Sequence, residues 1–504
     1  MNLQENWKHL KSGTDIRGVA LAGVAGQSVD LTDEVIRQIA SSFAFWLQEK
    51  SGKKAPTVAL GRDSRLSGPR IMELFKDELC RAGFTVLCCG LSSTPAMFMT
   101  TLDLATDAAI QITASHHPWN RNGLKFFLPT GGLEGKDIGE ILLLCQEGKG
   151  AVAREGGTVR EVSYMDTYAE RLKKLIRDGV GDGEKPLSGF HVTVDAGNGA
   201  GGFYVEKVLE PLGADCTGSQ FLEPDGSFPN HIPNPENKEA MAFACRAVKD
   251  AGADLGIIFD TDVDRAGCVD STGKEINRNR LVALASVIAL QDNPGGAVVT
   301  DSITSSGLKT FIEEKLGGVH LRFKRGYKNV INKAIEMNRE GINTPLAIET
   351  SGHAALRENY FLDDGAYLAT RILIEAAKMK KEGRDLVELI SALSEPYEST
   401  ELRFSIPHPD FRAKGEKLLS DLEAYAKENA WLLAEDSFEG VRVALPEGQG
   451  DGWFLLRLSV HDPVMPLNLE SDVEGGCKKI AEKLYAFLKD REEIDSTPMK
   501  EFLA

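Results

Sequence analysis

The chain has 504 residues, which is enough for roughly three to five domains of ordinary size. Its hydrophobic fraction of 42% and charged fraction of 26% are typical of a globular protein with several buried cores. A formal net charge of −17 argues against nucleic acid as a partner, because binding to a phosphate backbone requires a basic surface. A local group of Arg and Lys side chains can still bind one small phosphorylated ligand.

The eight cysteines are scattered and form no Cys-x-x-Cys pair, so we expect reduced thiols rather than disulfides. The N-terminal residues contain no apolar stretch of signal-peptide length, and no apolar run approaches the roughly 20 residues of a membrane helix. We therefore expect a cytoplasmic protein with no membrane partner. An organelle protein whose transit peptide has been removed is the alternative.

A strand–loop–helix pattern occurs three times, beginning at Thr57, His191 and Gly296. In each copy a short apolar run ends near an Asp, a Gly/Ser loop and an amphipathic helix follow, and a second apolar run comes about 20 residues after the Asp. This pattern predicts a βαβ unit whose parallel strands are joined by a right-handed crossover. Three separate copies indicate three related α/β domains.

The last part of the chain, from about Glu395, alternates short strand patterns with long helical patterns and predicts a small antiparallel α+β domain. We expect four domains, at residues 1–160, 161–273, 274–392 and 393–504.

The first motif with chemical character is an apolar strand that runs into Ala-Ser-His-His-Pro, with Ser115 at its centre. Pro118 prevents the strand from continuing, so Ser115 should lie on a tight loop at a strand end, where α/β folds place their ligands. A Ser hydroxyl there can act as a nucleophile or phosphoryl carrier, and His116 and Lys125 can neutralise phosphate charge or move protons. A loop Ser that only caps a turn is the alternative.

The second motif is a buried strand that leads into Asp260, Asp262 and Asp264. In an extended segment these alternating carboxylates share one face and repel one another unless a cation lies between them, and hard oxygen ligands of this kind suit Mg²⁺. An EF-hand is excluded, because Arg265 and Ser271 stand where Gly and Glu are required. A phosphatase that uses Asp260 as its nucleophile remains an alternative.

The third motif follows the strand Leu-Ala-Ile and contains Glu349, Ser351 and His353. Glu and Ser at alternate positions can bind neighbouring sugar hydroxyls, while His353 alone could equally be a buried structural histidine. Asp363 and Asp364 predict the N-terminal cap of the helix that follows.

Four motifs in this order resemble the loops of the α-D-phosphohexomutase family, nearest its phosphomannomutase/phosphoglucomutase branch. They are Ser-Gly-Thr-Asp-Ile-Arg-Gly from Ser12, Thr-Ala-Ser-His-His-Pro around Ser115, Asp-Thr-Asp-Val-Asp-Arg from Asp260 and Glu-Thr-Ser-Gly-His from Glu349. The resemblance covers nearly the whole chain. It implies three related α/β domains and a C-terminal α+β domain around a central active-site cleft.

The resemblance also implies which residues take part in the reaction. The catalytic residues would be Ser115, His116, Lys125 and Arg17. The metal ligands would be a phosphate oxygen on Ser115 together with Asp260, Asp262 and Asp264. The substrate would be bound by Arg265, Lys324, Arg325, Glu349, Ser351, His353, Arg457, Ser459 and His461.

One departure from the family pattern lies in the C-terminal phosphate loop, which usually reads Arg-x-Ser-Gly-Thr-Glu-Pro-x-x-Arg. Arg457, Ser459 and Pro463 are kept, but the Gly, Thr, Glu and second Arg are replaced by Val460, His461, Asp462 and Pro466. The loss of a bidentate Arg should weaken the grip on the phosphate that does not react, unless a protonated His461 compensates.

We therefore expect a phosphohexomutase, an intramolecular phosphotransferase that interconverts hexose 1-phosphate and hexose 6-phosphate, with glucose or mannose as the sugar. The expected cofactors are Mg²⁺ and a hexose 1,6-bisphosphate, which acts as activator and intermediate. The expected partner is a small phosphosugar, with no nucleic acid, and the protein should be a monomer or a homodimer. Three alternatives are a phosphoglucosamine mutase, a magnesium-dependent sugar-phosphate phosphatase and a non-catalytic sugar-phosphate binder.

Overall fold

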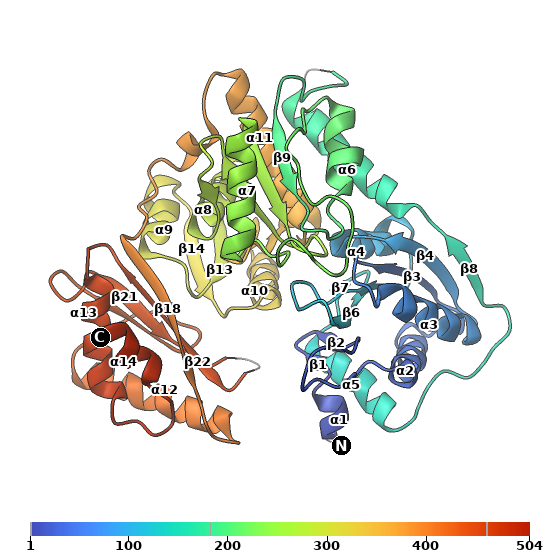
Figure 1. Ribbon diagram of the computed structural model, residues 1–504, viewed down its shortest axis with the longest axis horizontal. Coiled ribbons are helices and arrows are strands. Elements are labelled where there is room, and N and C mark those ends of the chain that lie inside the picture. Colours follow the sequence, from blue (N-terminus) through green and yellow to red (C-terminus); the bar gives the residue numbers. More distant parts are fainter. Residues whose placement is uncertain (1–2, 182, 460–461) are drawn as a thin grey trace. The chain divides into compact units, whose positions relative to one another are not determined.

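The computed structural model describes residues 3–181, 183–459 and 462–504 (Figure 1). The chain folds into two compact units. Unit 1 contains the described residues up to Asn277 together with Ser351–Ala354 and Leu362–Glu388, and unit 2 contains Arg278–Thr350, Ala355–Phe361 and the described residues of Leu389–Ala504. The chain therefore leaves unit 1 and returns to it before it ends in unit 2.

Unit 1 begins with a mixed sheet in the order β1-β2-β6-β5-β3-β4-β8, with β7 paired to β6. Strand β3 is parallel to β4 and β5, whereas β5 and β6 are antiparallel. The strands are β1 (Lys11–Ser12), β2 (Asp15–Val19), β3 (Thr57–Arg62), β4 (Thr85–Leu91), β5 (Ala108–Ile112), β6 (Arg121–Leu128), β7 (Gly131–Gly132) and β8 (Thr158–Glu161).

The apolar faces of α2, α3 and α5 form one core with this sheet, and α4 packs on β3, β5 and β6 outside that core. Helix α2 shows how the sequence sets its ends: Thr32 accepts a hydrogen bond from the Val35 amide, and Gly52 ends the helix in the left-handed region. The helices are α1 (Glu5–Lys8), α2 (Asp33–Ser51), α3 (Gly68–Arg81), α4 (Thr94–Asp103) and α5 (Gly135–Gln146).

The second sheet of unit 1 has the order β12-β11-β10-β9, and α6, α7 and α11 belong to the same unit (Figure 1). Strands β9 and β10 are parallel, while β10 and β11 are antiparallel. These elements are α6 (Tyr164–Val180), β9 (Val192–Asp195), η1 (Tyr204–Leu209), η2 (Glu210–Leu212), α7 (Lys238–Ala251), β10 (Leu255–Phe259), β11 (Ala266–Asp270), β12 (Glu275–Ile276), β17 (Leu362–Asp363) and α11 (Gly365–Lys381).

The second repeat differs from the predicted βαβ unit, because residues 213–221, all of them described, contain no returning strand. Two isolated bridges, His191 with Asp215 and Asp195 with Gln220, stand where the strand was expected. The segment Ala-Asp-Cys-Thr-Gly-Ser-Gln is rich in turn formers, and Gly218 has a φ of +88°. The prediction of a full strand was therefore wrong at this position.

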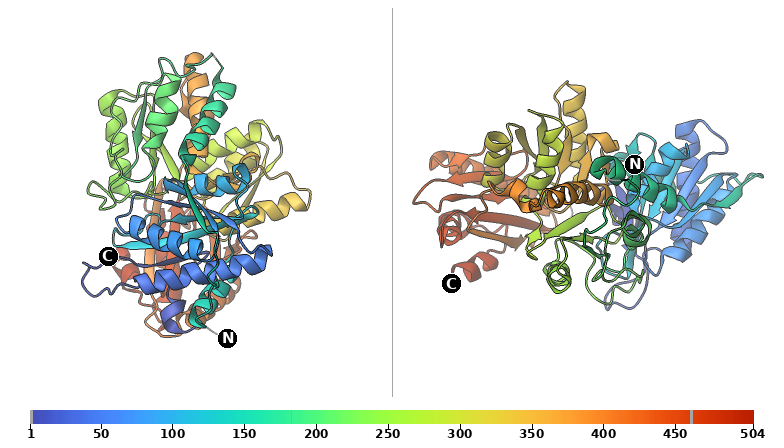
Figure 2. Two further views of the ribbon diagram at one scale, coloured as in Figure 1. Left: turned by 90° about the vertical axis from the view of Figure 1, so that its right-hand side faces the viewer. Right: turned by 90° about the horizontal axis from the view of Figure 1, so that it is seen from above.

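Unit 2 contains the parallel strands β14, β13 and β15 and, after them, an antiparallel sheet in the order β18-β22-β21-β20-β19. Helices α12, α13 and α14 share one apolar core with this second sheet (Figure 2). The elements are α8 (Asn279–Gln291), β13 (Ala297–Asp301), α9 (Ser306–Thr310), η3 (Phe311–Lys315), β14 (Val319–Phe323), α10 (Tyr327–Arg339), β15 (Leu346–Ile348), β16 (Ala354–Leu356), η4 (Arg357–Asn359), η5 (Leu386–Ile390), β18 (Glu398–Ser405), α12 (Phe411–Glu428), β19 (Leu432–Leu433), β20 (Val441–Leu445), β21 (Gly452–Leu456), β22 (Val464–Ser471), α13 (Gly476–Leu488) and α14 (Thr497–Leu503).

The antiparallel C-terminal sheet and its helices agree with the predicted α+β domain. All eight cysteines are free thiols, as predicted, and five of them are buried. In the described part of the chain, no helix has both the length and the apolar character needed to cross a membrane.

Gly365, the first residue of α11, allows this helix to approach the loop that follows β10. Its amide donates to the carbonyl oxygen of Val263, at 3.1 Å. A Cβ atom on Gly365 would lie 2.5–2.9 Å from backbone atoms of Arg265, which cannot move aside as a side chain can. The close packing of α11 on the acidic loop therefore requires glycine here.

We predict that Gly365→Ala destabilises the protein by about 1–3 kcal/mol, because the added methyl group has no room. The measurement is urea denaturation followed by circular dichroism. Gly139→Ala in α5 is the matched control, since the nearest atom to its Cβ would be the Lys11 Nζ at 3.5 Å, and it should be neutral or stabilising. Equal stability of the two variants would contradict the prediction.

Candidate active site

Ser115 lies on a buried loop that directly follows β5, as the sequence predicts. The residue is 3% exposed and has a φ of +51°, a left-handed conformation that is uncommon outside glycine. Its hydroxyl donates to the Asp260 Oδ2 at 3.0 Å and accepts from the Arg265 Nη2 at 3.1 Å. The serine of the predicted first domain and the acidic loop of the predicted second domain are thus in direct contact within unit 1.

The acidic loop gathers three carboxylates in the interior of unit 1. Asp260, Asp262 and Asp264 are all 0–1% exposed, and each offers an oxygen within 4.8 Å of the others. The loop is not the extended segment that the sequence suggested, because Val263 adopts a φ of +65° and residues 261–264 form a turn. The carboxylates converge because of this turn and not because of strand alternation.

Lys125, on β6, forms ion pairs with two of these carboxylates. Its Nζ lies 2.9 Å from the Asp262 Oδ2 and 2.5 Å from the Asp264 Oδ2. Burial opposes ionisation of Asp264, but Lys125 and then His353 hold the pKa of this carboxyl below its ordinary value. Burial and the two neighbouring carboxylates raise the pKa of Asp260 well above its ordinary value.

The donor set fits a divalent cation. The Oδ1 atoms of Asp262 and Asp264 are buried and accept no hydrogen bond from the described residues. A buried carboxylate oxygen without a partner is unfavourable, and a hard cation satisfies it. Asp260, Asp262 and Asp264 are therefore the residues that could hold a metal ion.

Thr94 is the first residue of helix α4, which packs on the first sheet, and it holds the acidic loop through two hydrogen bonds. Its amide donates to the Asp262 carbonyl oxygen at 2.8 Å, and its hydroxyl donates to the Oδ2 of the same residue. This residue was not among those predicted from the sequence. The sequence around it, Ser-Thr-Pro at positions 93–95, predicts the start of a helix but does not reveal a contact with a distant loop.

Arg265 and His116 complete the surroundings of the serine hydroxyl. The Arg265 Nε donates to the Asp260 Oδ2 at 3.2 Å, and its Nη2 donates to the His116 Nδ1 at 2.6 Å. Because Nδ1 accepts this bond, His116 is neutral. Burial, followed by the positive charge of the Arg265 guanidinium, lowers the pKa of His116 far below its ordinary value.

Arg17, on β2, also reaches the serine loop. Its Nη2 donates to Asp15 at 2.7 Å, and its Nη1 lies 3.5 Å from the Ala114 carbonyl oxygen. The structure therefore brings together all four predicted catalytic residues and the three acidic ligands.

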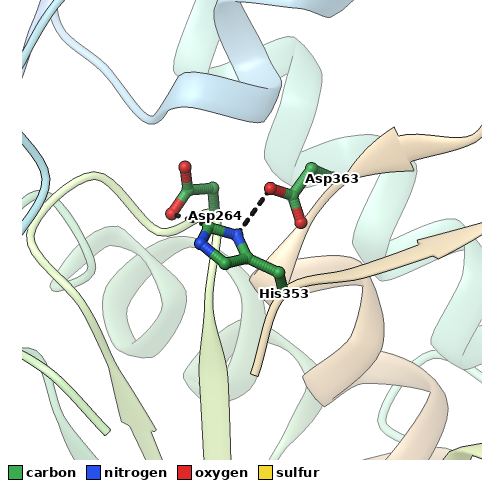
Figure 3. Close-up of side chains that lie close together, drawn as sticks. All are labelled: Asp264, His353 and Asp363. Atoms are coloured by element: carbon green, nitrogen blue, oxygen red, sulfur yellow. Dashed lines mark hydrogen bonds and ion pairs between the residues drawn. The ribbon is translucent and has the colours of Figure 1, made fainter. Parts of the chain in front are cut away.

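His353 and Asp363 form a second pair beside Asp264 (Figure 3). The His353 Nδ1 donates to the Asp363 Oδ2 at 2.6 Å and lies 4.0 Å from the Asp264 Oδ1. Burial opposes protonation, but Asp363 and Asp264 raise the pKa of His353 to about 9. Asp364 caps α11 by accepting from the Tyr367 amide, in the region predicted from the sequence, whereas the side chain of Asp363 binds His353.

The remaining predicted substrate contacts are divided between the units. Ser351 is in unit 1, where its buried hydroxyl has no hydrogen-bond partner among the described residues. In unit 2, Glu349 accepts from the Gly326 amide at 2.6 Å, which links it to the segment that carries Lys324 and Arg325.

The expected C-terminal phosphate loop corresponds to the segment that joins β21 to β22, which is described up to Ser459 and again from Asp462. The Ser459 amide donates to the Val464 carbonyl oxygen at 3.0 Å, and Pro466 is buried inside β22. Arg457 is 7% exposed, its Nε has no hydrogen-bond partner in the described part of the chain, and burial followed by the nearby Arg325 lowers the pKa of its guanidinium. His461 lies outside the described residues.

Three family models match the chain in order. They are the phosphoglucomutase/phosphomannomutase alpha/beta/alpha domains I, II and III, at residues 10–143, 166–273 and 277–397. A phosphoglucomutase of Neisseria gonorrhoeae is 30% identical over 476 residues, which is 94% of this chain and 96% of that protein. The chain belongs to the phosphoglucomutase/phosphomannomutase family.

Other relatives of this phosphoglucomutase/phosphomannomutase family member agree. A phosphomannomutase/phosphoglucomutase of Pseudomonas putida is 31% identical over 461 residues, covering 90% of this chain and 93% of that one. The structure of a family protein from Burkholderia thailandensis superposes with a TM-score of 0.78 at 28% identity, covering 97% and 98% of the two chains. That of Aspergillus fumigatus N-acetylphosphoglucosamine mutase, in complex with GlcNAc-6P and magnesium, superposes with a TM-score of 0.52 at 13% identity, covering 91% and 97%. The predicted family, its fold and its class of enzyme are confirmed.

We predict that Lys125→Met lowers the stability of the metal-free protein by about 3 kcal/mol, because it leaves buried carboxylates without their cation. Excess divalent cation should restore most of this loss. Thermal unfolding with EDTA and with millimolar Mg²⁺ or Mn²⁺ measures both effects. Lys149→Met is the control, since Lys149 is an exposed partner of Glu147 and its loss should change little. An unchanged transition of Lys125→Met in EDTA would refute the electrostatic role.

Proposed function

We propose that this protein interconverts hexose 1-phosphate and hexose 6-phosphate, of glucose or mannose, through a phosphoserine at Ser115. The observation that carries the proposal is the position of the Ser115 hydroxyl, 3.0 Å from a carboxylate of the acidic loop and 3.1 Å from the Arg265 guanidinium. A nucleophile placed between a potential metal ligand and a fixed cation suits phosphoryl transfer, which depends on positioning and on stabilisation of negative charge.

In the first half of the reaction, the bond between phosphorus and the Ser115 Oγ breaks, and a hydroxyl oxygen of the sugar monophosphate bonds to the phosphorus as its proton leaves. The product is a hexose 1,6-bisphosphate. After the bisphosphate reorients, its other phosphoryl group returns to Ser115 and the isomeric monophosphate is released. Opening and closing of the site must retain the intermediate while it turns.

The described side chains have separate tasks in this scheme. The Arg265 Nη2 is placed to stabilise charge on the Ser115 oxygen as the bond to phosphorus breaks. Asp363 binds the His353 Nδ1 and orients the ring beside Asp264. The neutral His116 keeps Arg265 oriented through its Nδ1.

We propose Mg²⁺ as the ion held by Asp260, Asp262 and Asp264, because all three ligands are hard carboxylate oxygens. Such an ion would neutralise negative charge on the phosphoryl group during its transfer.

The proposed ligand is a phosphosugar, and a pair of arginines in unit 2 supports this choice. Arg325 lies close enough to Arg457 to lower its pKa, and the buried Arg457 Nε has no partner among the described residues. Arg325 forms an ion pair with Asp301, whereas the open Nε of Arg457 favours an anion, and the phosphate that is not transferred supplies one. Isomerisation rates on glucose, mannose and glucosamine phosphates decide which sugar is preferred. A preference for glucosamine phosphate would favour the phosphoglucosamine mutase alternative.

Two predicted alternatives fit the geometry less well. For a phosphatase, the Asp260 carboxylate would have to attack phosphorus, yet it is 0% exposed and its Oδ2 is occupied by Ser115 and Arg265. A non-catalytic binder would not need a serine hydroxyl in direct contact with this acidic loop.

We predict that Ser115→Ala abolishes phosphate uptake from glucose 1,6-bisphosphate and lowers isomerisation by at least about 10³-fold, because the nucleophile is lost. Intact mass and phosphopeptide mapping give the first result, and a coupled assay of glucose 6-phosphate gives the second. Ser188→Ala, at an exposed serine, should keep both properties. Acid-labile phosphate on Asp260 in either variant would instead support the phosphatase.

We also predict that Mg²⁺ raises the melting temperature of the wild type and that Asp262→Asn largely removes this shift, because a ligand charge is lost. Isothermal titration of both proteins gives the affinities, and a decrease of about 10-fold or more is expected. The control Asp225→Asn changes an aspartate that accepts the hydrogen bonds of a turn at the exposed Ser227. Equal affinity of wild type and Asp262→Asn would place the ion elsewhere.

A further inference from the structure

The loop that carries Ser115 has an unusual backbone. Ser115 is held at a φ of +51°, and its amide is bonded to the Thr113 hydroxyl at 2.9 Å. A conformation of this kind in a residue other than glycine persists only where its surroundings impose it. The direction of the Ser115 hydroxyl depends on this conformation, so the group that imposes it also controls the reaction.

The Arg65 guanidinium is bonded to four backbone carbonyl groups of this loop. Its Nη1 donates to the carbonyl oxygens of Pro118 and Arg121, each at 2.8 Å. Its Nη2 donates to the carbonyl oxygen of His117 at 2.5 Å and to that of Ser115 itself. All four terminal donors of the side chain are thus directed at one loop.

Asp63 holds this arginine in place from the end of β3. Its Oδ1 accepts from the Arg65 amide at 2.9 Å, and its Oδ2 lies 3.4 Å from the Arg65 Nε. Both side chains are 0% exposed, so the pair is a buried ion pair whose charges are compensated by each other and by the loop carbonyls. The Phe228 ring, 5.2 Å from the guanidinium, covers it.

We propose that Arg65 is a positioning residue for phosphoryl transfer, because it fixes the Ser115 loop in the conformation that aims the hydroxyl at Asp260 and Arg265. It does not contact the Ser115 Oγ and acts only through the backbone. A planar fork of donors can bind four carbonyl groups at once, whereas the single ammonium of a lysine cannot. The inference rests on the proposed function, since it assigns Arg65 a part in that reaction.

The first test compares Arg65→Lys with Arg70→Lys. Arg70, on helix α3, also donates to backbone carbonyl oxygens, but they are those of Ala20 and Leu31 and not those of the serine loop. For Arg65→Lys we expect kcat to fall about 10²-fold with KM nearly unchanged, because the nucleophile is misplaced while the substrate contacts remain. Arg70→Lys should change kcat less than about threefold, whatever it does to stability.

The second test measures the loop without using activity. Hydrogen exchange of residues 114–121 should accelerate in Arg65→Lys and not in Arg70→Lys. Slow exchange in Arg65→Lys together with a normal kcat would overturn the proposal. If the wild type itself takes up no phosphate on Ser115, the proposed function fails, and the exchange data still decide whether Arg65 holds the loop.

A third test remains decisive even where Arg65→Lys folds poorly. A cavity of about 520 Å³ is lined by Arg65 together with Arg62, Leu66, Pro69 and Asn198, so truncation of this buried side chain should extend the cavity to the position of the guanidinium. In Arg65→Ala, added guanidinium chloride at low millimolar concentration should raise kcat several-fold, and methylammonium at the same concentration should not. Asp63→Asn should also lower kcat, as Arg65→Lys does. Absence of guanidinium rescue together with full activity of Asp63→Asn would also overturn the proposal.

Discussion

Asp260, Asp262 and Asp264 are buried together in a volume that could accept a single ion, and much of unit 1 serves to make this arrangement tolerable. Three ionised carboxylates at such separations repel strongly when water is excluded. Lys125 and Arg265 compensate part of the charge, Thr94 donates to Asp262, and two carboxylate oxygens still have no hydrogen-bond partner among the described residues. The site is therefore built for one further cation, and Arg265, one of the two cations that stabilise it, also donates to the serine hydroxyl.

The predicted site residues that the structure brings together lie in short contiguous motifs. Ser115, Lys125 and the three aspartates could be recognised because their types and spacing already suggest phosphate and metal chemistry, and the structure brings them into contact. The three α/β repeats and the antiparallel C-terminal domain were predictable for the same reason, since their apolar patterns have clear periods.

The features that sequence reasoning missed depend on the backbone. Arg65 binds carbonyl groups, which every residue possesses, so no side-chain pattern marks the loop that it holds. The turn at Val263 required a left-handed φ from a β-branched residue, which intrinsic preferences argue against. The second repeat has turns in place of its expected returning strand, and the pairing of Asp363 with His353 was missed because the two residues lie ten positions apart in the sequence.

The path of the chain between the two units has a consequence for dissecting this protein into fragments. His353, Asp363 and the first residue of α11 all belong to unit 1, although the polypeptide reaches them only after most of the third repeat. A recombinant piece that stopped at Asn277 would contain the proposed nucleophile and the acidic turn but would lack the helix that packs on Val263 and Arg265. Truncation at Asn277 would thus remove part of the proposed catalytic centre, and split or permuted versions should be joined elsewhere.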